Sequence, residues 1–190
     1  MERINANFSK EELQLLKELK GKEFKSYQHG DFLSIRNMSY GKIRLVFQDK
    51  AIEITNDLVP VYYDNENDDV GMFRCMEVQK DSPYDSGIEE ETIETIVNET
   101  VKEVSVNEDI ITISDPKTGS GCFCFVYDNA VIIETDKNLY TFYSYSQYND
   151  SVSYSHNEKF EQLFSVKDQK RNWSSPGINK VVIERKSIKL

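Results

Sequence analysis

The chain has 190 residues, of which 38% are hydrophobic and 29% charged; 23 Lys and Arg stand against 33 Asp and Glu, for a net charge of −10. This composition excludes collagen-like, low-complexity and wholly disordered proteins. No apolar run approaches the roughly 18 residues that a membrane span needs. A negative field repels phosphate backbones, so we expect neither a nucleic-acid partner nor a membrane partner.

The charge is unevenly distributed along the chain. Residues 1–80 carry 12 basic and 14 acidic groups, residues 81–160 carry 4 and 16, and residues 161–190 carry 7 and 3. We therefore expect the basic C-terminal segment to dock on the acidic middle third. The N-terminus has no apolar signal core. Cys75, Cys122 and Cys124 are accordingly interpreted as reduced structural thiols of a cytoplasmic protein.

The clearest local signal is a helix start near the N-terminus. Ser9 and Glu12 form a Ser-x-x-Glu capping box, and Phe8 and Leu13 are placed to form a hydrophobic staple around it. Leucines recur on one face as far as Leu19, and a glycine at position 21 is a natural stop. The pattern predicts an amphipathic helix over residues 10–20.

Strand patterns follow the helix. Residues 23–28 and 32–37 flank a turn-type triplet at 29–31. Alternating apolar residues over 43–47 and 52–54, with a turn at 48–50, predict a hairpin with one buried face. Pro60 indicates an edge position for the next strand, at 59–63. The predicted core consists of Ile43, Leu45, Phe47, Ile52, Ile54, Phe123, Phe125, Val131 and Ile133.

An 80-residue offset relates two parts of the chain. Ser86 and Glu89 repeat the capping box, Ile93, Ile96 and Val97 follow at helical spacing, and residues 123–127 and 131–133 repeat the hairpin around a turn at 128–129. A period of this length indicates duplication or chance. On the duplication interpretation the fold class is α+β, with two tandem helix-plus-antiparallel-meander repeats packed as one pseudo-symmetric body. The expected domains are a first repeat at 1–80, a second repeat at 81–154, and a C-terminal helix and strand at 155–190.

Motifs for catalysis and metal binding fail at their diagnostic positions. Residues 64–75 start like a calcium loop but carry Asp69 and Cys75 where Gly and a bidentate Glu are required. A Gly-Ser-Gly at 119–121 leads into a strand and not into a nucleophile elbow. His29 and His156 have no nucleophile nearby in sequence and are interpreted as surface residues of turns. We predict no catalytic residue, no metal and no cofactor, and lean against an enzyme.

Residues 140–154 are rich in Tyr, Ser and Asn, as binding paratopes are. The alternative is an ordinary Tyr-rich strand. A run of glutamates opens the second predicted helix, where the helix dipole alone would explain it. The candidate partner-binding residues are Tyr143, Tyr145, Tyr148, Glu89, Glu90 and Glu91.

Residues 19–24 read Leu-Lys-Gly-Lys-Glu-Phe, and residues 47–54 read Phe-Gln-Asp-Lys-Ala-Ile-Glu-Ile. These segments resemble the "L-x-G-K" lead-in and the "F-x-D-x-x-(I/L)-x-I" hairpin of small acidic bacterial families of the toxin-immunity type. The resemblance implies a protein that binds and does not catalyse. We therefore expect a non-enzymatic, immunity-like binding protein of the bacterial cytoplasm that engages a protein partner, and the acidic charge favours a basic one. The alternative is a small-molecule-binding or hydrolytic domain with a site between the repeats.

Overall fold

A computed structural model describes residues 2–63, 66–145, 149–174 and 179–190. The elements are β1 (Glu2–Ala6), α1 (Lys10–Lys17), β2 (Glu23–Gly30), a 3-10 turn (Ser34–Arg36), β3 (Met38–Tyr40), β4 (Lys42–Phe47), β5 (Ala51–Tyr63), β6 (Glu66–Val78), β7 (Thr92–Ser114), β8 (Gly121–Thr135), β9 (Leu139–Tyr143), β10 (Ser151–His156), α2 (Phe160–Leu163), α3 (Val166–Trp173) and β11 (Lys180–Lys189).

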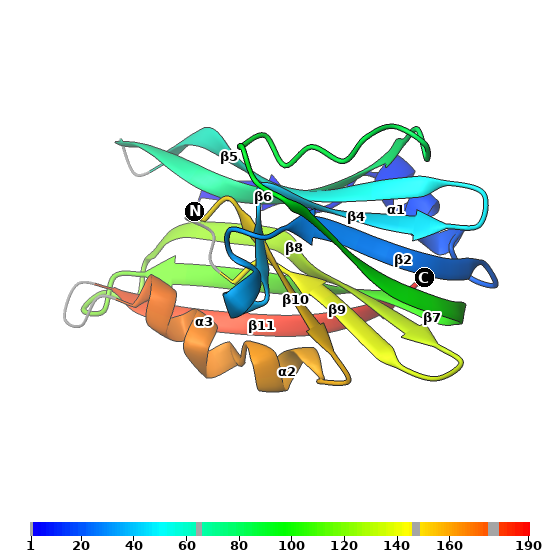
Figure 1. The fold of residues 1–190 in the computed structure, drawn as a ribbon. Helices are drawn as coiled ribbons and strands as arrows, with labels where there is room; N and C mark the ends of the chain where they lie inside the picture. Colours follow the sequence, from blue (N-terminus) through cyan, green and yellow to red (C-terminus); the bar gives the residue numbers. More distant parts are fainter. Residues whose placement is uncertain (1, 64–65, 146–148, 175–178) are drawn as a thin grey trace.

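The described strands form one eleven-stranded sheet in the order β3-β10-β9-β8-β7-β2-β4-β5-β6, with β1 added to β8 and β11 added to β7. Every pairing is antiparallel except the parallel one between β1 and β8. The sheet folds back on itself into two layers. In Figure 1, β4–β6 lie above, and β8, β9 and β11 lie below with α2 and α3 on their outer side.

Strand β7 belongs to both layers. Its first part, residues 92–100, pairs with β2 of the upper layer, and its later part pairs with β8 and β11 of the lower one. The pairing register shifts near residues 96–103 against both β2 and β8, and Asn98 adopts a positive φ of 53° within this stretch. Bulges bend and twist a strand, so this stretch is where β7 passes from one layer to the other.

The α+β class predicted from the sequence is wrong, and so are the helix-plus-meander repeats. The predicted second helix begins at its Ser86 capping box, but residues 86–91 form no helix and the rest of it lies in the 23-residue strand β7. The Ser86 hydroxyl donates to the Ile88 carbonyl and caps no helix, and Gly87 takes a φ of 89°. The stretch is rich in Thr, Val and Ile, whose β-branched side chains favour strands over helices.

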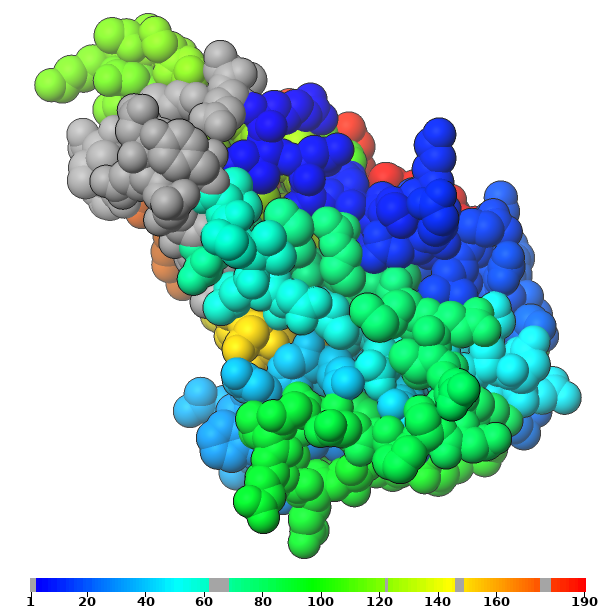
Figure 2. Space-filling view, turned by 90° about the horizontal axis from the view of Figure 1, so that it is seen from above, coloured from blue at the N-terminus to red at the C-terminus, as the bar shows by residue number. Residues whose placement is uncertain are grey.

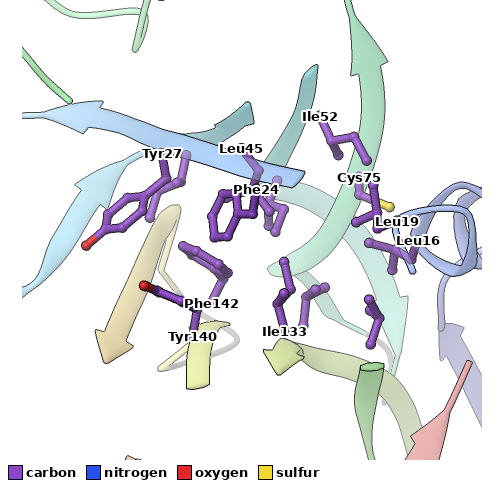
Figure 3. Packing of buried hydrophobic residues seen from close by; sticks show 14 of the residues in the cluster. Leu16, Leu19, Phe24, Tyr27, Leu45, Ile52, Cys75, Ile133, Tyr140 and Phe142 are labelled. Carbon is purple, nitrogen blue, oxygen red and sulfur yellow. The ribbon is translucent and has the colours of Figure 1, made fainter. Parts of the chain in front are cut away.

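Three of the predictions in the first half of the chain are confirmed, whereas the strand predicted at residues 32–37 is wrong because a 3-10 turn lies there. Helix α1 begins with the predicted capping box between Ser9 and Glu12. Strands β4 and β5 form the predicted hairpin. All nine predicted core residues are buried. Figure 3 shows how Phe24 and Leu45 of the upper layer approach Ile133 and Phe142 of the lower one.

The predicted turn at Asp128 and Asn129 is instead the middle of the continuous strand β8. Asn107 pairs with Ala130 and the next residue of β7 pairs with Asp128, so Asn129 is the extra residue of a bulge. The Asn129 side-chain NH2 group donates a 2.8 Å hydrogen bond to the Asp109 carboxylate. The side-chain oxygen of Asn129 accepts a 2.7 Å hydrogen bond from the Asn107 side chain. An Asp-Asn pair with buried hydrogen-bond partners can thus sit inside a strand.

The basic C-terminal segment docks on the acidic middle third, as predicted. Strand β11 pairs with β7, and Arg185 donates two 2.7 Å hydrogen bonds to the fully buried Asp109. Lys186 and Lys189 pair with glutamates of β7. The Arg185 guanidinium also lies 4.7 Å from the centre of the Phe160 ring, and this contact joins α2 to the sheet. None of the described helices has the length and apolar composition of a membrane span.

Candidate partner-binding surface

Two segments meet at the end of the upper layer, where β2 finishes and β7 begins. The Asp31 amide donates 3.0 Å to the Glu91 carbonyl, and the Glu91 amide donates 3.1 Å to the Asp31 carboxylate. The Phe32 amide donates 2.9 Å to the Glu90 carboxylate. These bonds fix the start of the 31–37 loop to Glu90 and Glu91, and the residues that they join are 58 and 60 positions apart along the sequence.

Gly30 makes this close approach possible. A Cβ at this position would lie 1.8–2.1 Å from the carboxyl group of Glu90, far closer than non-bonded atoms approach. The absent side chain lets Glu90 fold over the strand end and accept from Phe32. The glycine was interpreted from the sequence only as part of a turn, and its partner could not be read from the local pattern.

Residues 79–91 cross the outer face of the upper layer without regular pairing before β7 begins (Figure 1). Arg44 holds this segment by donating 2.6 Å to the Ser82 carbonyl and 3.1 Å to the Pro83 carbonyl. The Tyr84 hydroxyl donates 2.8 Å to the Lys42 carbonyl. The glutamates at the end of the segment are therefore presented from an anchored backbone.

Exposed apolar side chains lie beside these carboxylates. Phe32 is 67% exposed and Ile35 is 94% exposed, both on the 31–37 loop. A shallow hollow of about 520 Å³ is lined by Phe32 and four acidic residues. Figure 2 shows the blue 31–37 loop beside the green 80–91 segment at one edge of the molecule. We call this region the acidic–apolar surface; it consists of Asp31, Phe32, Ile35, Glu89, Glu90 and Glu91.

The three predicted glutamates thus lie together, whereas the tyrosines lie elsewhere. Tyr143 is buried on β9 against Phe160 of α2, at 5.6 Å between ring centres. Tyr145 is 49% exposed and packs 5.2 Å from Phe164. Tyr148 lies outside the described residues. Within the described part of the chain, no hydrogen bond, ion pair or ring contact joins these tyrosines to the glutamates, so their binding role stays a separate prediction.

The sequence interpretation missed Phe32 and Ile35, because residues 32–37 were predicted as a strand. The structure shows a loop with a 3-10 turn there, stabilised by the Ser34 hydroxyl and amide, which both donate to the Asp31 carbonyl. An Asp three residues before a turn end is a recognisable turn signal. The exposure of the two apolar side chains follows from that turn.

Of the two histidines predicted to be surface residues, His156 is exposed as predicted and His29 is buried. His29 is only 2% exposed and packs 4.6 Å from the ring of Tyr154, whereas His156 is exposed and packs 5.1 Å from Tyr140. The burial of His29 depends on β10, more than 120 residues away. Within the described ranges, no group of three or more His, Cys, Asp or Glu is placed to hold a metal ion.

The sequence and the fold were compared with those of known proteins, and no match was found. No protein-family model matches the sequence, and neither a curated protein nor a solved structure matches it significantly.

Proposed function

We propose that this protein is a non-enzymatic binding protein that engages a basic protein partner through the acidic–apolar surface. The observation that carries the proposal is the exposure of Phe32 and Ile35 beside the carboxylates of Asp31, Glu89 and Glu91, on loops whose backbones are hydrogen-bonded to each other. Apolar anchors with a charged rim are typical of protein interfaces.

The charges support a basic partner in particular. The middle third of the chain, which contributes the three glutamates, carries 16 acidic groups against 4 basic ones. Complementary charge steers association and raises its rate, and salt screens the effect. The resemblance to toxin-immunity families agrees with such a role.

The proposal places the protein in the cytoplasm. Cys75 and Cys124 are free and buried, and unpaired thiols are typical of reducing compartments. Burial raises the pKa of the Cys75 thiol to about 12, which keeps it protonated and unreactive.

The test compares capture of proteins from the native cytoplasm by the wild type and by the double variant Phe32→Ala/Ile35→Ala. Because both side chains are exposed, the variant should fold normally, which circular dichroism checks. We expect the wild type to retain a basic protein that the variant does not retain.

The matched control is Ile96→Ala/Val182→Ala, which removes exposed apolar side chains outside the acidic–apolar surface. This control should capture the same protein as the wild type. Equal capture by all three proteins, or capture by none, would contradict the proposal.

A further inference from the structure

A separate cavity of about 240 Å³ opens between the two layers of the sheet. It is lined by Tyr27 of β2, by Tyr154, Ser155 and His156 of β10, and by Asn37 and Glu158. Small-molecule sites usually measure about 300–1,000 Å³. At roughly 30 Å³ per water, this cavity has room for about eight waters, which suits a small ion or a single side chain better than a large ligand.

Aromatic rings form the walls of this cavity. Tyr27 and Tyr154 lie 5.7 Å apart between ring centres, and the buried His29 packs behind them at 6.0 and 4.6 Å. Tyr140 packs 5.1 Å from His156 at the rim. His29 is itself fixed by a 2.9 Å contact between Nδ1 and the Gly30 carbonyl. The walls are therefore held by both layers before any ligand arrives.

Two hydroxyl groups of the cavity are open to a ligand or to water. Tyr27 is only 7% exposed as a residue, but within the described residues neither its hydroxyl nor that of Tyr154 is among the buried polar atoms that lack a partner. In Figure 3 the Tyr27 hydroxyl points away from the aliphatic core around Leu16 and Leu19. A hydroxyl that reaches solvent can bind water or a polar group of a ligand.

The charges of the lining favour a cation. Glu158 supplies a carboxylate, which accepts 2.7 Å from the Ser155 hydroxyl, and none of the six lining residues is Lys or Arg. The rings of Tyr27 and Tyr154 have electron-rich faces that attract cations.

We propose that this cavity binds an organic cation, an alkylammonium or guanidinium group, against the rings of Tyr27 and Tyr154 and beside Glu158. The cation is either a free amine or a Lys or Arg side chain of a bound protein. Only the second source rests on the proposed function. The cavity adjoins the acidic–apolar surface, since Asn37 in its lining ends the loop that carries Phe32 and Ile35, and the Asn37 carbonyl accepts a 2.8 Å hydrogen bond from the Tyr154 amide.

The test is an NMR titration of the full chain with choline and, separately, with its neutral isostere 3,3-dimethyl-1-butanol. The two histidines are the only ones in the chain, so their ring signals report on this region without overlap. We expect saturable shifts of the His156 signals with choline and none with the alcohol. Equal shifts with both, or none with either, would overturn the proposal.

Variants locate the site. Tyr154→Leu should weaken choline binding roughly tenfold by removing one wall. His156→Lys, at an exposed position, should weaken it by placing a positive charge at the rim, and it keeps the test valid should Tyr154→Leu unfold. Leu58→Ala, which shortens an exposed side chain outside the cavity, should leave binding unchanged. Binding that is unaffected by the first two variants would contradict the assignment.

The source of the cation is tested by competition. If choline displaces the partner captured through the acidic–apolar surface, the cavity takes a side chain of that partner; if both bind together, it takes a free amine. The choline titration needs no partner, so its failure is distinct from failure of the proposed function.

Discussion

The contact between Gly30 and Glu90 predicts a coupling that a double-mutant cycle can measure. In Gly30→Ala, the new Cβ would lie 1.8–2.1 Å from the Glu90 carboxyl group. The carboxyl group must therefore move by at least about 1 Å, which breaks its 2.9 Å hydrogen bond from the Phe32 amide. A hydrogen bond to a charged group contributes about 1.5–3 kcal/mol to the free energy of unfolding. Glu90 is partly exposed, so we take about 1.5 kcal/mol.

Gly30→Ala should therefore change the free energy of unfolding by different amounts in the wild type and in the Glu90→Ala variant. Ala in a strand is favoured over Gly by about 0.5 kcal/mol, so Gly30→Ala alone should cost about 1 kcal/mol. Glu90→Ala should cost about 1.5 kcal/mol. Once Glu90 is truncated, Gly30→Ala should stabilise by about 0.5 kcal/mol, which gives a coupling free energy of about 1.5 kcal/mol.

The assay is urea unfolding followed by circular dichroism, with m compared among the variants to confirm two-state behaviour. The matched control cycle uses Glu91→Ala in place of Glu90→Ala, because the three atoms nearest to a Cβ at position 30 all belong to the Glu90 carboxyl group. The control cycle should be additive within about 0.3–0.5 kcal/mol. The same additivity in the Glu90 cycle would refute the geometry on which the acidic–apolar surface depends.

Three further predictions concern the rest of the fold. Phe47→Ala and Phe125→Ala should each lower the free energy of unfolding by about 3–5 kcal/mol in urea, because both side chains are fully buried; a loss below about 1 kcal/mol would contradict the packing. Arg185→Ala should cost about 3–5 kcal/mol, because it leaves the Asp109 carboxylate buried without its ion-pair partner, whereas Lys180→Ala on the same strand should cost little. Burial raises the pKa of Asp128 to about 6, above its value of about 3.9 in the unfolded chain. Its ionisation therefore destabilises the folded state above pH 6, and the penalty disappears as the pH falls towards 4. Asp128→Asn should stabilise the protein more at pH 7.5 than at pH 4, and thermal unfolding at the two pH values would show no such difference if the group titrated normally.

Local signals in the sequence predicted local structure well. The capping box at Ser9 and Glu12 sets the start of α1 through bonds that span three residues. The alternation around residues 43–54 predicted the hairpin and its buried face. Both signals depend on the chemistry of adjacent residues, which a single sequence contains in full.

The predictions that failed depend on distant parts of the chain. Residues 92–97 have the spacing of a helix, but pairing with β2 makes them the start of β7. Asn129 looks like a turn residue until Asp109 and Asn107 supply it with buried partners. His29 is buried because Tyr154, from β10, packs against it. Such pairings determine the structure of these segments, and nothing in their local sequence indicates them.

The candidate site was predicted in part. The run of glutamates at 89–91 was selected for its charge, and the structure places it beside the 31–37 loop. The apolar half of the surface was missed, because the local sequence around Phe32 does not distinguish a buried strand from an exposed loop. The tyrosine-rich stretch was interpreted as a partner-binding face, whereas Tyr154 lines a cavity and Tyr143 packs under α2.

The most direct test of the central claim is the dissociation constant of the purified complex, measured by surface plasmon resonance for the wild type, Phe32→Ala/Ile35→Ala and the control Ile96→Ala/Val182→Ala. We predict a loss of at least about 2 kcal/mol, or roughly 30-fold, for the surface variant only. Neutralising Glu89 and Glu91 should mainly slow association, as high salt should. An unchanged dissociation constant for Phe32→Ala/Ile35→Ala would contradict the account.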